Sequence, residues 1–129
     1  MTHLPAPVEL LAVAAGGAVG AVTRFLCQTM LPMLSQHGAA TMAVNITGSL
    51  IIGVVWVVMR HFALSPLWSL FVITGILGGF TTYSSFSLDT IRMIEQGETV
   101  RAAIYAGGTL IFCLIACGTA FYITERLLK

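Results

Sequence analysis

Hydroxyl and aromatic side chains follow a pair of glycines in the segment 75–87, GILGGFTTYSSFS, which lies in a long apolar stretch. If the residues after the glycines are helical, Tyr83, Phe86 and Ser87 stand at i, i+3 and i+4 and share one face. Ser84 joins Ser87 at the i, i+3 spacing. Hydroxyl groups donate hydrogen bonds and aromatic edges carry partial positive charge, so this face suits a small anion. Ordinary aromatic packing, with the hydroxyls bonded to the preceding turn, is the alternative.

Asn45 and Arg24 are polar residues inside two other apolar stretches. The Asn45 amide carries two N–H donors, which either bond a neighbouring helix or line an ion path. Arg24 comes one helical turn after Gly20, the second glycine of a GxxxG pair with Gly16 that allows another helix to approach closely. Its guanidinium either reaches the lipid headgroups or places a positive charge at the mouth of a pore.

Weaker signals lie in the final apolar stretch, where Tyr105 and Thr109 share a helix face at i, i+4. Cys113 and Cys117 have the same spacing, which could be half of a metal site. All three histidines fall in expected tails or loops, so no histidine completes such a site. We therefore interpret the cysteines as small apolar packing residues.

The glycine pair Gly78–Gly79 and the threonine pair Thr81–Thr82 are poor helix formers in the middle of an apolar stretch. They predict a helix that is broken, with unwound backbone near 78–82. Irregular backbone at membrane depth is tolerated only where it is buried in protein or lines a cavity. The carbonyls that such a break frees can coordinate a cation.

The composition indicates whether these residues lie in a soluble protein or in a membrane protein. Of 129 residues, 57% are apolar and 9% are charged, with a mean hydropathy of +0.95. Soluble proteins carry about 25% charged residues, so a soluble globular domain is excluded. The net charge of +1 gives no reason to expect nucleic acid as a partner.

Four apolar stretches are long enough to span a bilayer, which takes about 20 residues. We expect an all-α membrane protein whose spans are 8–31, 39–59, 67–94 and 101–124, forming one transmembrane domain over 1–129. Pro32 and the polar residues up to Gly38 form the loop after the first span. Residues 1–8 lack Lys and Arg, so we expect no cleaved signal peptide. No room remains for a soluble catalytic module, and we expect no enzyme.

The distribution of positive charges does not favour either orientation of the chain in the membrane. If the N-terminus is cytoplasmic, three basic residues lie on the cytoplasmic side and three on the other, namely Arg60, Arg126 and Lys129 against Arg24, Arg92 and Arg101. A chain with so little bias can insert both ways, and two opposite copies can pair as an antiparallel dimer. The alternative is that one orientation wins for reasons that this count misses.

We place no Asp, Glu, Lys or His in the interior of a span, and we interpret Asp89 to Arg101 as a solvated helix end and loop. Neutral donors, aromatic rings and one Arg suit a small anion better than a proton or a cationic drug, which needs an intramembrane carboxylate. The runner-up function, a small multidrug-type exporter with four helices, requires an acid in the first span. Glu9 lies too near the start of that span to serve. An accessory membrane subunit would need neither Asn45 nor the break.

The sequence resembles the Fluc/CrcB family of fluoride channels along essentially its whole length. The matching motifs are GGAVGAVTRF at 16–25, AVNITGS at 43–49, GILGGFTTYSSFS at 75–87 and YAGGT at 105–109. The third motif in a four-span chain is specific, whereas the first alone is weak. The resemblance implies a passive fluoride-selective channel in the bacterial inner (plasma) membrane. It also implies a dual-topology antiparallel homodimer with two pores.

The resemblance assigns roles residue by residue. It implies a structural sodium ion (Na+) held by the backbone carbonyls of Gly78 and Thr81, and it places Arg24 at an aqueous vestibule. The pore lining that it implies comprises an amide, two aromatic rings and a track of hydroxyls: Asn45, Tyr83, Phe86, Ser84, Ser85, Ser87, Tyr105 and Thr109. The family most often has Phe at the position of Tyr83, and Thr is common at the position of Ser85.

Overall fold

The computed structural model describes residues 4–30 and 38–129. Every long element in these ranges is a helix. The order is α1 (Pro7–Met30), α3 (Ala39–His61), α4 (Pro66–Ser69), η2 (Leu70–Leu77), α5 (Gly78–Phe80), α6 (Tyr83–Glu95) and α7 (Thr99–Leu127). The last residue of the first expected span, Leu31, and the expected loop through His37 lie outside the described residues.

Four helical stretches are long and apolar enough to cross a membrane, which confirms the predicted number of spans. They are α1, α3, the continuous run Pro66–Glu95 made by α4 to α6, and α7. In the described ranges the observed ends lie within three residues of the expected ones. The chain is therefore a multi-pass, all-helical membrane protein.

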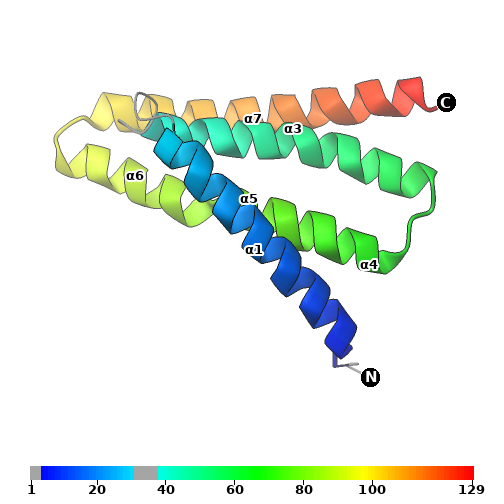
Figure 1. Ribbon diagram of the computed structural model, residues 1–129. Helices are drawn as coiled ribbons and strands as arrows, with labels where there is room; N and C mark the ends of the chain where they lie inside the picture. The colour runs from blue at the N-terminus through cyan, green and yellow to red at the C-terminus, as the bar shows by residue number, and fades with distance from the viewer. Residues whose placement is uncertain (1–3, 31–37) are drawn as a thin grey trace.

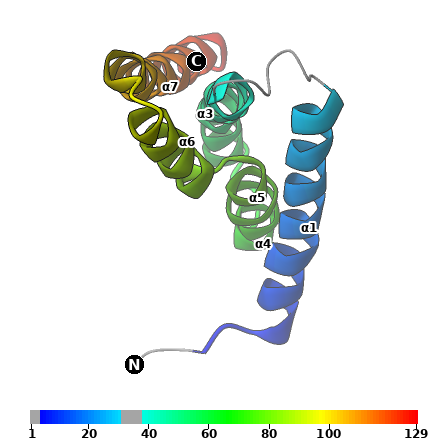
Figure 2. The same cartoon turned by 90° about the vertical axis from the view of Figure 1, so that its left-hand side faces the viewer.

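The spans pack as two neighbouring pairs. α3 contacts α7 most extensively, and the two run in the same direction (Figure 1). α1 crosses the other side of the molecule and packs on η2 and α5. Figure 2 shows α4 and α5 between α1 and the α3–α7 pair, with α6 reaching toward α7. The third span thus has protein on two sides.

Glycine brings α1 into backbone contact with the third span. A Cβ on Gly16 would collide with the carbonyl oxygen of Phe71, and one on Gly20 would collide with that of Ile76. From the other side, a Cβ on Gly79 would lie 2.6 Å from the carbonyl oxygen of Gly17. The small-residue stripe therefore packs one helix against another within the chain, as the GxxxG spacing predicts.

The third span is interrupted over a shorter stretch than we expected. Gly78–Phe80 is helical, so the prediction of irregular backbone over 78–82 is wrong for its first three residues. Thr81 (φ −80°, ψ 157°) and Thr82 (φ −150°, ψ 113°) are extended and separate α5 from α6. The absence of a side chain on Gly79 allows the close approach of α1, whereas a Cβ on Gly78 would meet only the carbonyl oxygen of Ile73, at 3.6 Å. Before them, η2 forms wider π-helical turns.

Candidate functional site

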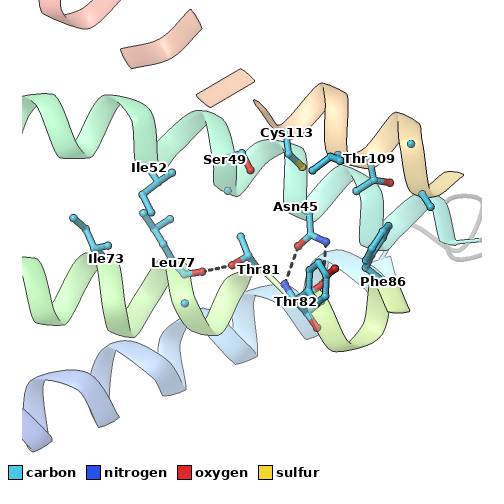
Figure 3. Close-up of a pocket in the computed structure, with 16 residues that line it drawn as sticks. Asn45, Ser49, Ile52, Ile73, Leu77, Thr81, Thr82, Phe86, Thr109 and Cys113 are labelled. Atoms are coloured by element: carbon cyan, nitrogen blue, oxygen red, sulfur yellow. Dashed lines mark hydrogen bonds between the residues drawn. The ribbon is translucent and has the colours of Figure 1, made fainter. Parts of the chain in front are cut away.

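A cleft of about 700 Å³ opens between α3, the middle of the third span and α7. The sixteen residues drawn in Figure 3 line it in the part of the chain that the structure describes, and none of them is charged. Six of the eleven predicted site residues are among them: Asn45, Gly78, Thr81, Tyr83, Phe86 and Thr109. The other five do not line the cleft: Arg24, Ser84, Ser85, Ser87 and Tyr105. The structure thus brings most of the predicted site together, although these residues come from three spans.

Asn45 holds the extended backbone after α5. Its Nδ2 donates to the carbonyl oxygen of Thr82 at 3.0 Å, and its Oδ1 accepts the N–H of Thr82 at 2.8 Å (Figure 3). A Cβ on Gly48, in the next turn of α3, would collide with the Thr81 side chain. α3 therefore fixes the break by a hydrogen-bonded pair and by close packing. One N–H of the Asn45 amide is left over from this pair, since the amide carries two.

The predicted serines lie around the start of α6. Thr82 is the N-cap of this helix, and its Oγ1 accepts the N–H of Ser85 at 3.1 Å. The hydroxyls of Ser84 and Ser85 lie 3.3 and 3.0 Å from the same oxygen. Ser87 donates to the Tyr83 carbonyl one turn back, at 3.0 Å. The hydroxyls of Ser85 and Ser87 are therefore engaged locally, and Ser84 has a longer contact.

Three aromatic rings form a chain from the cleft toward α7. The ring centroids of Tyr83 and Phe86 are 5.3 Å apart, and those of Phe86 and Tyr105 are 5.5 Å apart. Tyr83 is 81% exposed, whereas Tyr105 is buried. The predicted face of α6 therefore exists, and Tyr105 extends it onto another helix.

Asp89 belongs to a polar cluster that the sequence reasoning missed. Its Oδ2 accepts the hydroxyl of Thr41 at 2.8 Å, and the hydroxyl of Tyr105 approaches the same oxygen at 3.5 Å. Thr41 is buried and Asp89 is partly buried, so the interpretation of Asp89 as part of a solvated helix end is wrong. The third span therefore does contain a carboxylate. Two spacings could have indicated it: Thr41 precedes Asn45 by one turn, and Asp89 follows Phe86 by one turn.

Thr109 carries the only buried side-chain polar atom without a hydrogen-bond partner among the described residues. Its Oγ1 is inaccessible to solvent, and the residue lines the cleft. A buried polar group without a partner is costly and requires an explanation.

The carbonyls at the break have lost their regular helical donors. In a continuous helix the carbonyl of Gly78 would accept the N–H of Thr82, and that of Thr81 would accept the N–H of Ser85. The N–H of Thr82 goes to Asn45, and that of Ser85 goes to the Thr82 hydroxyl. Both carbonyls proposed for sodium are thus deprived of the donor that would otherwise occupy them. Both residues also line the cleft.

Arg24 reaches the same region from α1. Its Nε donates to the carbonyl oxygen of Gly79 at 3.1 Å, and the side chain is half-buried. Arg24 is not among the residues that line the cleft. Within residues 4–30 and 38–129, no group of three or more His, Cys, Asp or Glu could hold a metal ion. A cation at this site would therefore depend on carbonyl oxygens.

Comparison with known proteins agrees with this architecture. The profile of a family described as "CrcB-like protein, Camphor Resistance (CrcB)" matches residues 11–121. The chain belongs to the CrcB family. One curated relative, "Fluoride-specific ion channel FluC" of Rhizobium meliloti (strain 1021), is 41% identical over 84% of this chain and 89% of its own length.

Two further relatives carry the same name. That of Erythrobacter litoralis (strain HTCC2594) is 44% identical over 81% of this chain and 83% of its own length. That of Caulobacter sp. (strain K31) is 37% identical over 92% of this chain and 96% of its own length. These CrcB relatives are named as ion channels and not as enzymes. The match spans all four helical stretches, so it concerns the whole architecture.

Proposed function

We propose that the chain is a fluoride-selective channel through which cytoplasmic fluoride leaves the cell passively. The observation that carries this proposal is the name of the relatives, "Fluoride-specific ion channel FluC", which align over 81–92% of the chain in the three cases given above. The uncharged cleft supports it. A small anion that leaves water needs close hydrogen-bond donors, and the amide and hydroxyl groups that line the cleft can offer them.

The pathway we propose follows the cleft. Asn45 supplies its remaining N–H, Thr109 its unpartnered hydroxyl, and the rings of Tyr83 and Phe86 their positively polarised edges. Ser84, Ser85, Ser87 and Tyr105 extend the track of hydroxyls, and Arg24 stands at an aqueous vestibule. Ser87 uses its proton in its bond to the Tyr83 carbonyl, so this hydroxyl must rotate to donate to an anion. Ser85 accepts the Thr82 hydroxyl and keeps its own proton for an anion.

A structural sodium ion fits the break in the third span, which we place at mid-membrane. The carbonyls of Gly78 and Thr81, whose helical donors are diverted, would hold it. Unwound carbonyls and half-helix ends are the groups that bind Na+ in other membrane proteins. The ion would supply fixed positive charge beside an anion path.

We propose that two copies assemble as an antiparallel, dual-topology homodimer with two pores, each copy being one transmembrane domain in the bacterial inner membrane. The even split of basic residues supports both orientations. The cleft is open in the single chain, which supports a second copy that would cover it. Cysteine pairs placed to cross-link only antiparallel copies test this arrangement. Exclusive cross-linking of parallel pairs would reject it.

The structure does not support the alternative function, a small multidrug-type exporter. Its required acid in the first span would be Glu9, but the Glu9 carboxylate accepts the N–H of Ala6 at 2.8 Å at the start of α1. It acts there as part of the helix N-terminus. The other acid within a span, Asp89, is bonded to Thr41 and lies outside the cleft lining.

Growth in fluoride tests the function in cells. A bacterium that lacks its own fluoride exporter is transformed with the chain and grown over a range of fluoride concentrations. We expect the wild type to restore growth and the variant Phe86→Ile to fail at equal expression. Growth that is identical with the wild type and with an empty vector would refute the proposal.

A further inference from the structure

Arg24 substitutes for a missing helical donor at the end of α5. In a regular helix the carbonyl of Gly79 would accept the N–H of the residue four positions later. The backbone becomes extended at Thr81 and Thr82, so that bond cannot form in the regular way. The Nε of Arg24 donates to the Gly79 carbonyl instead, at 3.1 Å. Basic side chains commonly satisfy the last carbonyls of a helix in this manner.

The packing of α1 on the third span places Arg24 close to Gly79. A Cβ on Gly79 would lie 2.6 Å from the Gly17 carbonyl oxygen and 3.2 Å from the N atom of Ala21, so the two backbones touch. Arg24 follows Ala21 by one turn and reaches Gly79 from this contact. Neither of the two ion pairs within the described ranges includes Arg24. Its fixed contact is therefore the carbonyl and not an acid.

The carbonyls near the break therefore fall into two classes, occupied and released. Those of Gly79 and Thr82 are occupied, the first by Arg24 and the second by Asn45. Those of Gly78 and Thr81 are the ones whose regular donors are diverted. Each released carbonyl is followed in the chain by an occupied one, Gly78 by Gly79 and Thr81 by Thr82.

We infer that Arg24 is a positioning residue for the cation site: by holding the Gly79 carbonyl from α1, it fixes the last turn of α5 so that the Gly78 carbonyl is presented to sodium. This inference rests on the sodium ion in the proposed function. It gives Arg24 a role apart from attracting anions at a vestibule. The bond to α1 and the bond from α3 to Thr82 together fix the two ends of the extended segment.

Measuring sodium binding in the absence of fluoride distinguishes a role of Arg24 at the cation site from an effect of Arg24 on the anion. The melting temperature of the purified protein is measured in detergent while N-methylglucamine is replaced by sodium at constant ionic strength. We expect sodium to raise the melting temperature of the wild type. We expect Arg24→Met to need at least about tenfold more sodium for half of the effect, which corresponds to about 1.4 kcal/mol.

Two variants make the assignment specific. Arg24→Lys keeps a donor and a charge on a long side chain, and we expect its sodium midpoint to stay within about threefold of the wild type. Arg92→Met, on the exposed end of α6, is the matched control and should leave the midpoint unchanged. If Arg24→Met does not fold, Arg24→Gln replaces it, because its shorter amide keeps a donor that falls short of Gly79.

Three outcomes would overturn the inference. The first is an unchanged sodium midpoint in Arg24→Met with reduced fluoride flux, since Arg24 would then act on the anion alone. The second is a midpoint that shifts equally in Arg24→Lys and Arg24→Met. The third is a wild type whose melting temperature does not respond to sodium. Failure of the channel proposal has a different signature, namely a wild type without fluoride efflux that still responds to sodium.

Discussion

The side chain of Asn45 pairs with both backbone groups of Thr82, donating to its carbonyl at 3.0 Å and accepting its N–H at 2.8 Å. The two residues lie on different spans, so the pair ties α3 to the extended segment of the third span. The same pair withdraws the Thr82 N–H from the Gly78 carbonyl. A residue that sequence reasoning offered either as an interhelical bond or as an ion-path donor therefore makes the bond and still lines the cleft.

Replacing Asn45 tests this pair. In Asn45→Asp the donor to the Thr82 carbonyl becomes a carboxylate oxygen, which repels that carbonyl. We expect reduced fluoride flux and a loss of about 1–3 kcal/mol of stability, the cost of leaving a buried polar group unsatisfied. The measurements are fluoride efflux and thermal unfolding in detergent. Ser49→Ala, one turn later on α3 and also in the cleft, is the control and should stay near wild type in unfolding.

Phe86 joins the rings of Tyr83 and Tyr105, with centroid distances of 5.3 and 5.5 Å. Phe86→Ile removes a polarised ring edge from the pathway while keeping an apolar side chain of moderate size. We expect fluoride flux to fall by about two- to tenfold, because an aromatic contact contributes about 0.5–1.5 kcal/mol. Phe25→Ile, at an exposed position of α1, should keep wild-type flux. Equal flux in the two variants would remove Phe86 from the pathway.

The four spans could be predicted from the sequence, because hydropathy and length decide them. The position of the break could be predicted only approximately. Gly78 and Gly79 have low helix propensity, yet both are helical, and α1 packs against Gly79. The interruption falls at Thr81 and Thr82, where Asn45 provides another partner for the backbone. That partner lies 37 residues away in the chain, so no local pattern reveals it.

The polar cluster around Asp89 could not be predicted from the sequence, for a related reason. Asp89 begins a run of charges that looks solvated, and its main partner, Thr41, is 48 residues away. Only the packing of α3 beside α6 makes that carboxylate an acceptor for a buried hydroxyl. The i, i+4 spacing of Tyr105 and Thr109 is a weak signal, and the contacts of Tyr105 with Phe86 and Asp89 give it a structural basis.

Asp89→Leu tests that cluster through stability. The change leaves the buried hydroxyl of Thr41 without its acceptor, which should cost about 1–3 kcal/mol. Asp89→Asn keeps an oxygen acceptor and should lose less. Thermal unfolding in detergent measures both, and Glu95→Gln at the exposed end of α6 is the control. If Asp89→Leu melts at the wild-type temperature, the bond from Thr41 contributes nothing to stability.

Two neighbouring glycines of α1 make a matched pair. Gly20→Ala places a Cβ against the carbonyl of Ile76, whereas a Cβ on Gly17 meets nothing within 4 Å. We expect Gly20→Ala to separate α1 from the third span and to lower the melting temperature. Gly17→Ala should keep or raise it, since alanine favours a helix by about 1 kcal/mol over glycine. The reverse order would contradict the contact between these helices.

Efflux from proteoliposomes tests the channel itself. The purified protein is reconstituted in liposomes loaded with both fluoride and chloride salts, in sodium-containing buffer, and external fluoride and chloride electrodes record release after the electrical potential is collapsed. We predict rapid fluoride release, negligible chloride release, and slow fluoride release from liposomes that carry Phe86→Ile. Absence of fluoride release by the wild type, or equal release of the two anions, would contradict the account.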